Sequence, residues 1–178
     1  MKRLIMCEGP NELTIMNILL EHDALVFTED DLIGLTPYHA RQIRTSTQVR
    51  TALNLYPGND VLIMRVGDKQ SDRLTIPADY REKIIGIEKY CTMPELEMLL
   101  IISEGQAKEY DKVKSTTSPK EFAKEHVRFN RKRYDNSSVF FRDYYGSDAG
   151  KLVSAIREYK RLKGAHRKDE LYLADLLK

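Results

Sequence analysis

The sequence lacks several features that would assign it to a protein class at once. Its 178 residues hold no apolar run near the roughly 20 residues of a membrane span. The two cysteines each lie in or beside an apolar run without metal-ligand spacing, so we expect buried thiols rather than a disulfide. The charged start is followed by only about five apolar residues, too few for a secretory signal. These absences favour a cytoplasmic protein.

Familiar catalytic signatures are missing as well. No glycine-rich loop ends in Gly-Lys-Ser/Thr, no nucleophile elbow occurs, and the four histidines show no ligand spacing. Charged residues make up 31% of the chain and hydrophobic ones 42%, with a net charge of +2. This is an ordinary globular balance without overall basicity, so function must be sought in local patterns.

The first hundred residues alternate between strand-like and helix-like segments. Short apolar runs predict strands at 4–7, 24–27 and 60–66, and a further run starts at Ile84 and ends near Cys91. Helical patterns predict helices at 11–22, at 37–55 after a Thr-Pro start signal, and from 94 onward. The alternation predicts an α/β fold with a mostly parallel central sheet of about four strands, flanked by helices.

The character of the chain changes after about residue 103. We expect residues 1–103 to form the α/β core and residues 104–178 to form a helical, basic extension packed on it. A capping box at 118–121 opens a short helix over 122–127, and 149–163 reads as a long amphipathic helix. A last short helix is predicted at 169–178.

Acidic residues follow two of the predicted strands. Glu8 comes after the first strand, and Asp68 and Asp72 come after the third. Parallel strands place their carboxyl ends at one edge of a sheet, where sites are commonly built. Converging carboxylates repel one another unless a cation offsets them, and oxygen-rich sites suit Mg²⁺ or Mn²⁺. A lone glutamate after a strand is equally consistent with a solvated turn residue.

The order of these motifs resembles the Toprim domain of topoisomerases, primases, recombination proteins and OLD-type nucleases. A hydrophobic strand, Glu-Gly-x-x-Glu and a helix appear as LIMCEGPNE at 4–12, and a later strand ends in Asp as VLIMRVGD at 61–68. The segment 90–100, YCTMPELEMLL, is similar to the Pro-x-x-Glu stretch of small stand-alone Toprim nucleases related to OLD and RloB proteins. The resemblance covers about the first hundred residues and implies a Toprim-like, Rossmann-like fold.

The resemblance implies a Mg²⁺- or Mn²⁺-dependent nuclease, or a related phosphoryl-transfer enzyme, acting on nucleic acid in phage defence or DNA repair. Glu8 and Asp68 would be the catalytic residues. Glu8, Asp68, Asp72 and Glu97 would hold the metal, with Glu95 as a substitute for Glu97. A protein partner such as an ATPase is a further implication, since OLD-type relatives often act beside one.

One departure from the family pattern leaves an alternative open. The family usually has Asp-x-Asp after the third strand, whereas this chain has Asp68, Lys69 and Gln70, with the next acid at Asp72. If Asp72 does not complete the site, the chain is a catalytically inactive, Toprim-like binding or regulatory subunit. Asp30 and Asp31 are substitute ligands. A receiver-like or nucleotide-binding domain is a third hypothesis, but it needs an acidic pair and a lysine that we cannot place.

Two basic segments are candidates for nucleic-acid binding. Cationic side chains interleaved with Phe129 and Tyr134 fit phosphate contact with base stacking, and a second set shares one face of the 149–163 helix. The alternative is the solvated side of ordinary surface elements. The candidate residues are Arg128, Arg131, Lys132, Arg133, Lys160 and Arg161.

Overall fold

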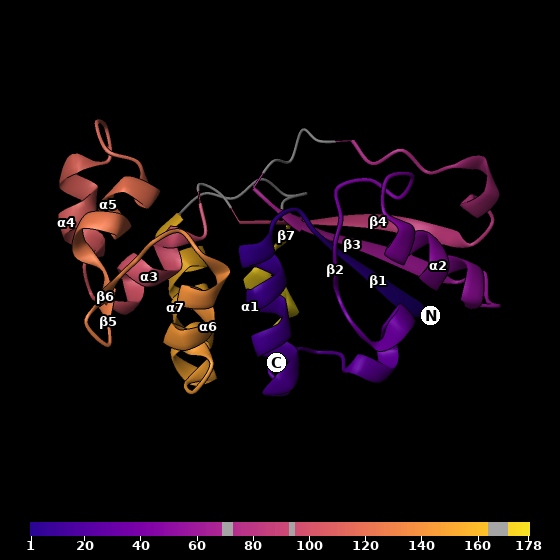
Figure 1. Ribbon diagram of the computed structural model, residues 1–178, viewed down its shortest axis with the longest axis horizontal. Helices are drawn as coiled ribbons and strands as arrows, with labels where there is room; N and C mark the ends of the chain where they lie inside the picture. Colours follow the sequence, from indigo (N-terminus) through magenta and orange to yellow (C-terminus); the bar gives the residue numbers. More distant parts are fainter. Residues whose placement is uncertain (69–72, 93–94, 164–170) are drawn as a thin grey trace.

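The structure is a computed structural model that describes residues 1–68, 73–92, 95–163 and 171–178 (Figure 1). Its centre is a five-stranded sheet in the order β2-β1-β3-β4-β7, and every pairing is parallel. The strands are β1 (Lys2–Cys7), β2 (Tyr38–His39), β3 (Val61–Gly67), β4 (Ile84–Cys91) and β7 (Leu171–Tyr172). The predicted α/β class with a parallel, Rossmann-like sheet is confirmed, with one strand more than expected.

The register of the three central strands brings their carboxyl ends to a common edge. β3 pairs with β1 along its length, so that Cys7 lies opposite Val66, and it pairs with β4 so that Gly67 lies opposite Cys91. The residues that follow these strands therefore emerge together. Both cysteines are buried thiols.

Helices cover both faces of the sheet and extend beyond its carboxyl edge. They are α1 (Pro10–Glu21), α2 (Thr47–Leu55), α3 (Glu97–Ser103), α4 (Ala107–Val113), α5 (Pro119–His126), α6 (Ser138–Tyr145) and α7 (Ala149–Lys163). A small antiparallel hairpin joins β5 (Arg128–Phe129) to β6 (Lys132–Arg133). Short 3₁₀ turns lie at η1 (Glu29–Asp31), η2 (Ile33–Leu35), η3 (Ala78–Tyr80) and η4 (Leu173–Leu176).

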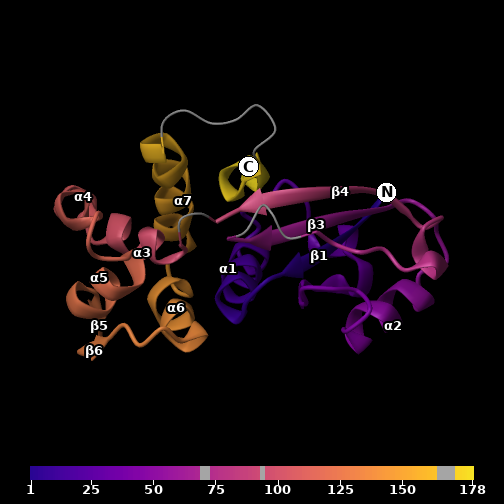
Figure 2. The same cartoon turned by 90° about the horizontal axis from the view of Figure 1, so that it is seen from above.

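Residues 97–145 form a helical lobe made of α3 to α6 and the β5–β6 hairpin. Figures 1 and 2 show this lobe beyond the carboxyl ends of the strands, with α7 and α1 between it and the sheet. α3 packs against α5 and α7, and α6 packs against α1. The lobe thus closes the edge of the sheet at which sites are expected in this class of fold.

Two hydrophobic clusters lie on opposite faces of the sheet. The smaller one joins Leu4, Met6 and Ile63 to Val49 and Leu53 of α2. The larger one joins the other face to α1, the helical lobe and α7. None of the described helices has the length and apolarity that crossing a membrane requires.

Two predicted elements near the second strand are wrong. Residues 24–27 form no strand; Leu25 makes only an isolated antiparallel bridge with Leu177. The second strand is instead β2, because Tyr38 and His39 pair with the open edge of β1. The helix predicted at 37–55 accordingly begins only at Thr47, after Ser46 accepts a hydrogen bond from the Val49 amide at 3.3 Å. Pairing with a buried strand outweighs a local helix-start signal.

The end of the chain also differs from expectation. The 169–178 helix is wrong over the described residues, because Leu171 and Tyr172 pair with Tyr90 and Cys91 as strand β7 and then enter the turn η4. Residues 169 and 170 lie outside the described part of the chain. The capping-box helix α5 and the helix α7 are confirmed.

Candidate functional site

Glu8 is fixed by the backbone at the end of β1. Its amide donates a hydrogen bond to the Val66 carbonyl at 2.9 Å, which continues the pairing with β3. Its side chain is only 10% exposed and lies against Gly67. A Cβ at position 67 would stand 2.4 Å from the Glu8 Oε2 and 2.8 Å from the Glu8 Cβ. Glycine at this position therefore leaves room for the carboxylate directly beside Asp68.

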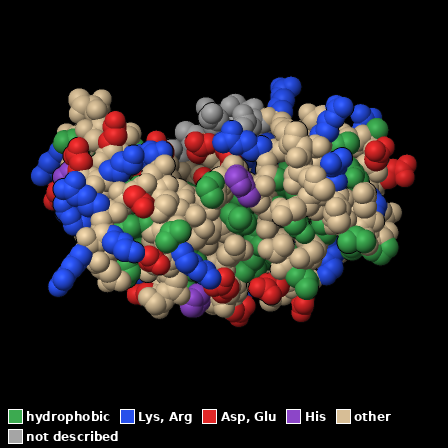
Figure 3. All heavy atoms as spheres, viewed as in Figure 1, with side chains coloured by type: hydrophobic (Ala, Val, Ile, Leu, Met, Phe, Trp, Pro, Cys, Tyr) green, Lys and Arg blue, Asp and Glu red, His purple; other side chains and the backbone are tan. Residues whose placement is uncertain are grey.

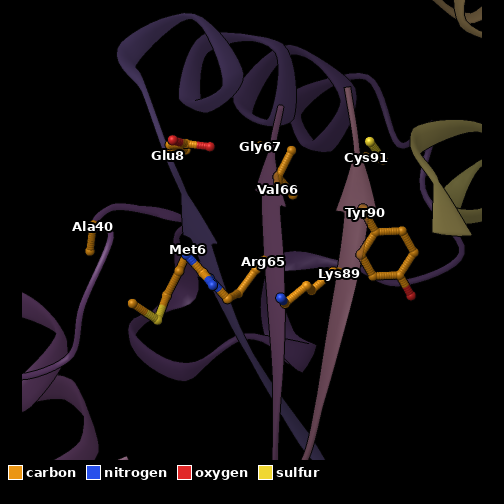
Figure 4. Close-up of a pocket in the computed structure, with 9 residues that line it drawn as sticks. All are labelled: Met6, Glu8, Ala40, Arg65, Val66, Gly67, Lys89, Tyr90 and Cys91. Carbon is orange, nitrogen blue, oxygen red and sulfur yellow. The ribbon is translucent and has the colours of Figure 1, made fainter. Parts of the chain in front are cut away.

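Cationic side chains lie near Glu8 in addition to Gly67. Arg41 Nη2 lies 3.5 Å from Glu8 Oε1, and Arg41 Nε donates to the Glu8 carbonyl at 3.3 Å. Figure 4 shows the adjacent hollow, where Arg65 and Lys89 project from the neighbouring strands one row behind Glu8. Arg65 is buried and donates to the Arg41 carbonyl at 3.5 Å. An anion bound in this hollow would lie close to the Glu8 carboxylate and to several positively charged side chains.

Glu12 is a site residue without a role among the predictions made from the sequence. It stands in the first turn of α1, and its carboxylate bends back over Gly9, where a Cβ would be 2.6 Å from Glu12 Oε2. Burial raises the pKa of Glu12 to about 7, and the negative charges of Glu8, Asp68 and Glu97 add to the increase. The available signal was the Glu-Gly-x-x-Glu spacing, which places Glu12 in the first turn of the helix that follows Glu8.

Asp68 and Glu97 complete the group that we call the acidic rim, made of Glu8, Glu12, Asp68 and Glu97. The Asp68 Oδ1 atom is buried and accepts no hydrogen bond within the described part of the chain. Glu97 begins α3, is 6% exposed, and accepts a 2.7 Å hydrogen bond from the Tyr134 hydroxyl. The ends of β1 and β3 and the start of α3 thus bring three carboxylates close enough to act on Glu12.

The other predicted acids are placed differently. Glu95 accepts a hydrogen bond from the Lys120 amide at 3.0 Å, and burial raises its pKa with help from the charges of Glu97 and Asp68. Asp72, with Lys69 and Gln70, lies outside the described residues. Asp30 and Asp31 do not reach the rim, because Leu32 bridges to Arg3 at the opposite end of β1.

The rim partly fits a divalent cation. Within the described part of the chain, no donor reaches the buried Asp68 Oδ1, and the pKa of Glu12 is raised to about 7. Both observations indicate negative charge that a bound cation would offset. Among residues 1–68, 73–92, 95–163 and 171–178, no three His, Cys, Asp or Glu side chains form a ready-made metal-binding group. Any ion would therefore draw Glu8, Asp68 and a third acid together.

The predicted nucleic-acid residues fall into two sets. Arg128, Lys132 and Arg133 are exposed on the hairpin, and Arg131 occupies its turn with a φ of 68°. The interleaved aromatic residues differ in burial: Tyr134 is buried, whereas Phe129 is partly buried and its ring packs edge-on to Tyr144 at 5.3 Å. Tyr134 therefore offers no exposed ring face for base stacking, whereas stacking on Phe129 stays a prediction.

The candidates on α7 are held by neighbouring acids. Lys160 pairs with Asp175, and the Arg161 guanidinium binds Glu158 through two contacts of 2.7 and 2.6 Å. Both side chains would have to leave these acids, at least in part, to reach a phosphate.

Comparisons of the chain with models of known protein families, with curated proteins and with solved structures gave no match. Function is consequently inferred from the residues of the site.

Proposed function

We propose that this chain is a Mg²⁺- or Mn²⁺-dependent nuclease that hydrolyses phosphodiester bonds of nucleic acid. The observation that carries the proposal is the acidic rim itself: the charges of Glu8, Asp68 and Glu97 all act on the Glu12 carboxyl at the carboxyl edge of a parallel sheet. Buried like charges are unfavourable unless a cation offsets them, and Mg²⁺ and Mn²⁺ prefer oxygen ligands. The Toprim-like order of the motifs supports the same assignment.

Each residue then has a chemical role. Glu8, Asp68 and Glu97 would hold the ion, which when bound supplies Lewis-acid stabilisation and a more acidic water. Glu12, with a pKa of about 7, is suited to accept a proton near neutral pH. Arg65 and Lys89 line the hollow beside Glu8 and would offset the charge of a phosphate there. Asp72 would add a ligand if its segment reaches the rim.

The second candidate is a catalytically inactive binding or regulatory subunit. The specific observation in its favour is that no three potential ligands in the described ranges form a ready metal group. Gln70 in place of the second aspartate points the same way. The setting that we propose for either function is the cytoplasm, in phage defence or DNA repair, beside a protein such as an ATPase.

One experiment separates the two candidates. The purified chain is incubated with Mn²⁺ or Mg²⁺ and labelled DNA or RNA, and Glu8→Gln is compared with Glu29→Gln, which alters an exposed acid outside the rim. We expect hydrolysis to fall at least about a hundredfold in Glu8→Gln and to stay unchanged in the control. Metal binding without hydrolysis of any substrate would favour the regulatory subunit. Hydrolysis that survives chelation of divalent ions would refute the nuclease proposal.

A further inference from the structure

A groove between α4 and α7 has an apolar floor. Met98 of α3, Tyr110 of α4, and Tyr159 and Leu162 of α7 line it. Tyr110 is held edge-on to Phe122 at 5.3 Å, and Leu162 is 45% exposed. The groove encloses about 770 Å³, within the ~300–1,000 Å³ range of ligand sites. It is therefore large enough to hold an extended ligand.

The walls of the groove are basic. Among the residues that the structure describes, Lys108, Lys112, Lys114 and Lys163 line it together with one acid, Asp111. Lys114 pairs with Asp111 at 2.6 Å, and Lys163 donates to the Tyr172 hydroxyl at 2.8 Å. Lys108 and Lys112 are exposed, lie one turn apart on α4, and form no ion pair with any residue that the structure describes. Figure 3 shows Lys and Arg side chains on this end of the molecule, interspersed with Asp and Glu. The groove thus favours an anionic ligand.

The groove shares helix α3 with the acidic rim. Met98 directly follows Glu97 on α3. Tyr159 lines both the groove and a small hollow that also contains Thr92 and Glu95. Burial raises the pKa of Tyr110, and the charge of Glu95 contributes to the increase. The groove and the rim acid Glu97 are therefore carried by the same short helix.

We propose that this groove binds a single strand of nucleic acid and directs it toward the acidic rim. Backbone phosphates would contact Lys108 and Lys112, while bases would rest on Tyr159 and Leu162, the more exposed part of the apolar floor. A duplex keeps the faces of its bases stacked inside the helix, so it would leave this floor unused. The direction of the strand rests on the proposed nuclease function, whereas binding in the groove does not.

The test measures binding without hydrolysis. A short labelled oligothymidylate is titrated by fluorescence anisotropy in EDTA with Lys108→Ala/Lys112→Ala and with the control Arg44→Ala/Arg50→Ala. The control removes the same charge from exposed positions in and before α2, on the other side of the sheet. We expect the groove variant to bind at least about tenfold more weakly and to lose roughly 1.4 from its salt slope, and the control to change less than about twofold.

Several outcomes would overturn the proposal. Equal weakening in both variants would mean that only overall charge matters. A duplex or an abasic strand that binds as tightly as the oligothymidylate would remove the role of the floor. Polyglutamate that binds more tightly, with the same lysine dependence, would identify the groove as a site for an acidic protein segment instead.

The two proposals fail in different ways. Lysine-dependent binding without hydrolysis of any strand in Mn²⁺ would support the groove and refute the nuclease. Hydrolysis that is lost in Glu8→Gln but unaffected in Lys108→Ala/Lys112→Ala would support the nuclease and refute the groove.

Discussion

The sheet and the helical lobe both supply acids to the rim, but they hold them by different means. The core between the sheet and α2 is mostly aliphatic, and Glu8 is fixed by a backbone hydrogen bond at the end of a strand. The lobe has an aromatic core, and its tyrosine hydroxyls bind polar neighbours: Tyr134 donates to Glu97, and Tyr145 pairs with Ser103 at 2.8 Å. The Glu97 carboxylate is therefore oriented by the Tyr134 hydroxyl group, whereas the backbone of Glu8 is held by pairing between β1 and β3.

The largest expected effect concerns the aromatic core of the lobe. Phe141 is fully buried, with ring contacts to Tyr134 and Tyr145. Phe141→Ala should lower the free energy of unfolding by about 3–5 kcal/mol, because it removes a large side chain and leaves a cavity. Urea denaturation measures the change. Val139→Ala on the same helix, 63% exposed, should change it by less than about 0.5 kcal/mol. A loss below about 1 kcal/mol in Phe141→Ala would mean that the lobe is loosely packed.

The second-largest expected effect concerns Glu12, the rim acid whose pKa lies near neutral pH. The pKa of Glu12 in the folded chain, about 7, lies above its ordinary value of 4.5, so the protonated form favours folding. This contribution is complete below about pH 4.5 and is lost as the pH rises through 7. Because Glu12 is partly exposed, we expect metal-free Glu12→Gln to be more stable than the natural chain by about 2 kcal/mol at pH 8, and little changed at pH 4.5.

Thermal or urea denaturation in EDTA at the two pH values checks this expectation. Mn²⁺ should narrow the difference at pH 8, since an ion held by Glu8, Asp68 and Glu97 would offset the charge of the ionised Glu12 carboxylate in the natural chain. Parallel pH profiles for the two proteins would show that Glu12 titrates normally.

A smaller effect tests the dependence of Glu97 on its hydroxyl donor. Tyr134→Phe keeps the ring that packs against Phe140 at 5.2 Å and removes only the hydrogen bond. The affinity for Mn²⁺ should fall about tenfold, because a group that orients a ligand is lost. Tyr144→Phe is the matched control, since its hydroxyl donates to Glu104 outside the rim. Calorimetric titration that gives equal affinities for the two variants would contradict the orienting role.

The smallest effect concerns the hairpin. Arg128 and Arg133 lie directly opposite each other across β5 and β6. Like charges in this position repel, so replacing both with Ala should stabilise the fold by about 0.5 kcal/mol. If the hairpin contacts nucleic acid, the same change should weaken strand binding a few-fold. A stability loss, measured by denaturation, would show that the arginines serve the fold rather than a ligand.

The sequence predicted the elements that carry strong local signals. The apolar runs gave β1, β3 and β4, the capping box gave α5, and acids directly after strands gave Glu8 and Asp68. Both acids do act on Glu12 in the structure, although the metal and catalytic roles of Glu8 and Asp68 stay predictions.

The rest depends on contacts between distant segments. β2 and β7 are two-residue strands that exist only because the edges of β1 and β4 offer hydrogen bonds. The hydrogen bond between Tyr134 and Glu97 joins residues 37 positions apart, and the groove joins α4 to α7. A pattern within one short segment does not predict contacts between distant segments. The propensity of 37–46 for a helix was real, but strand pairing prevailed over it.

The tight contact at Gly67 has a consequence for how the chain can vary. Any side chain there would meet the Glu8 Cβ at 2.8 Å, a position that rotation of the glutamate does not change. In a saturation library, position 67 should behave as though it were chemically essential although it offers no functional group. Its intolerance would measure how closely the first and third strands must approach for the acids at their tips to work as one unit.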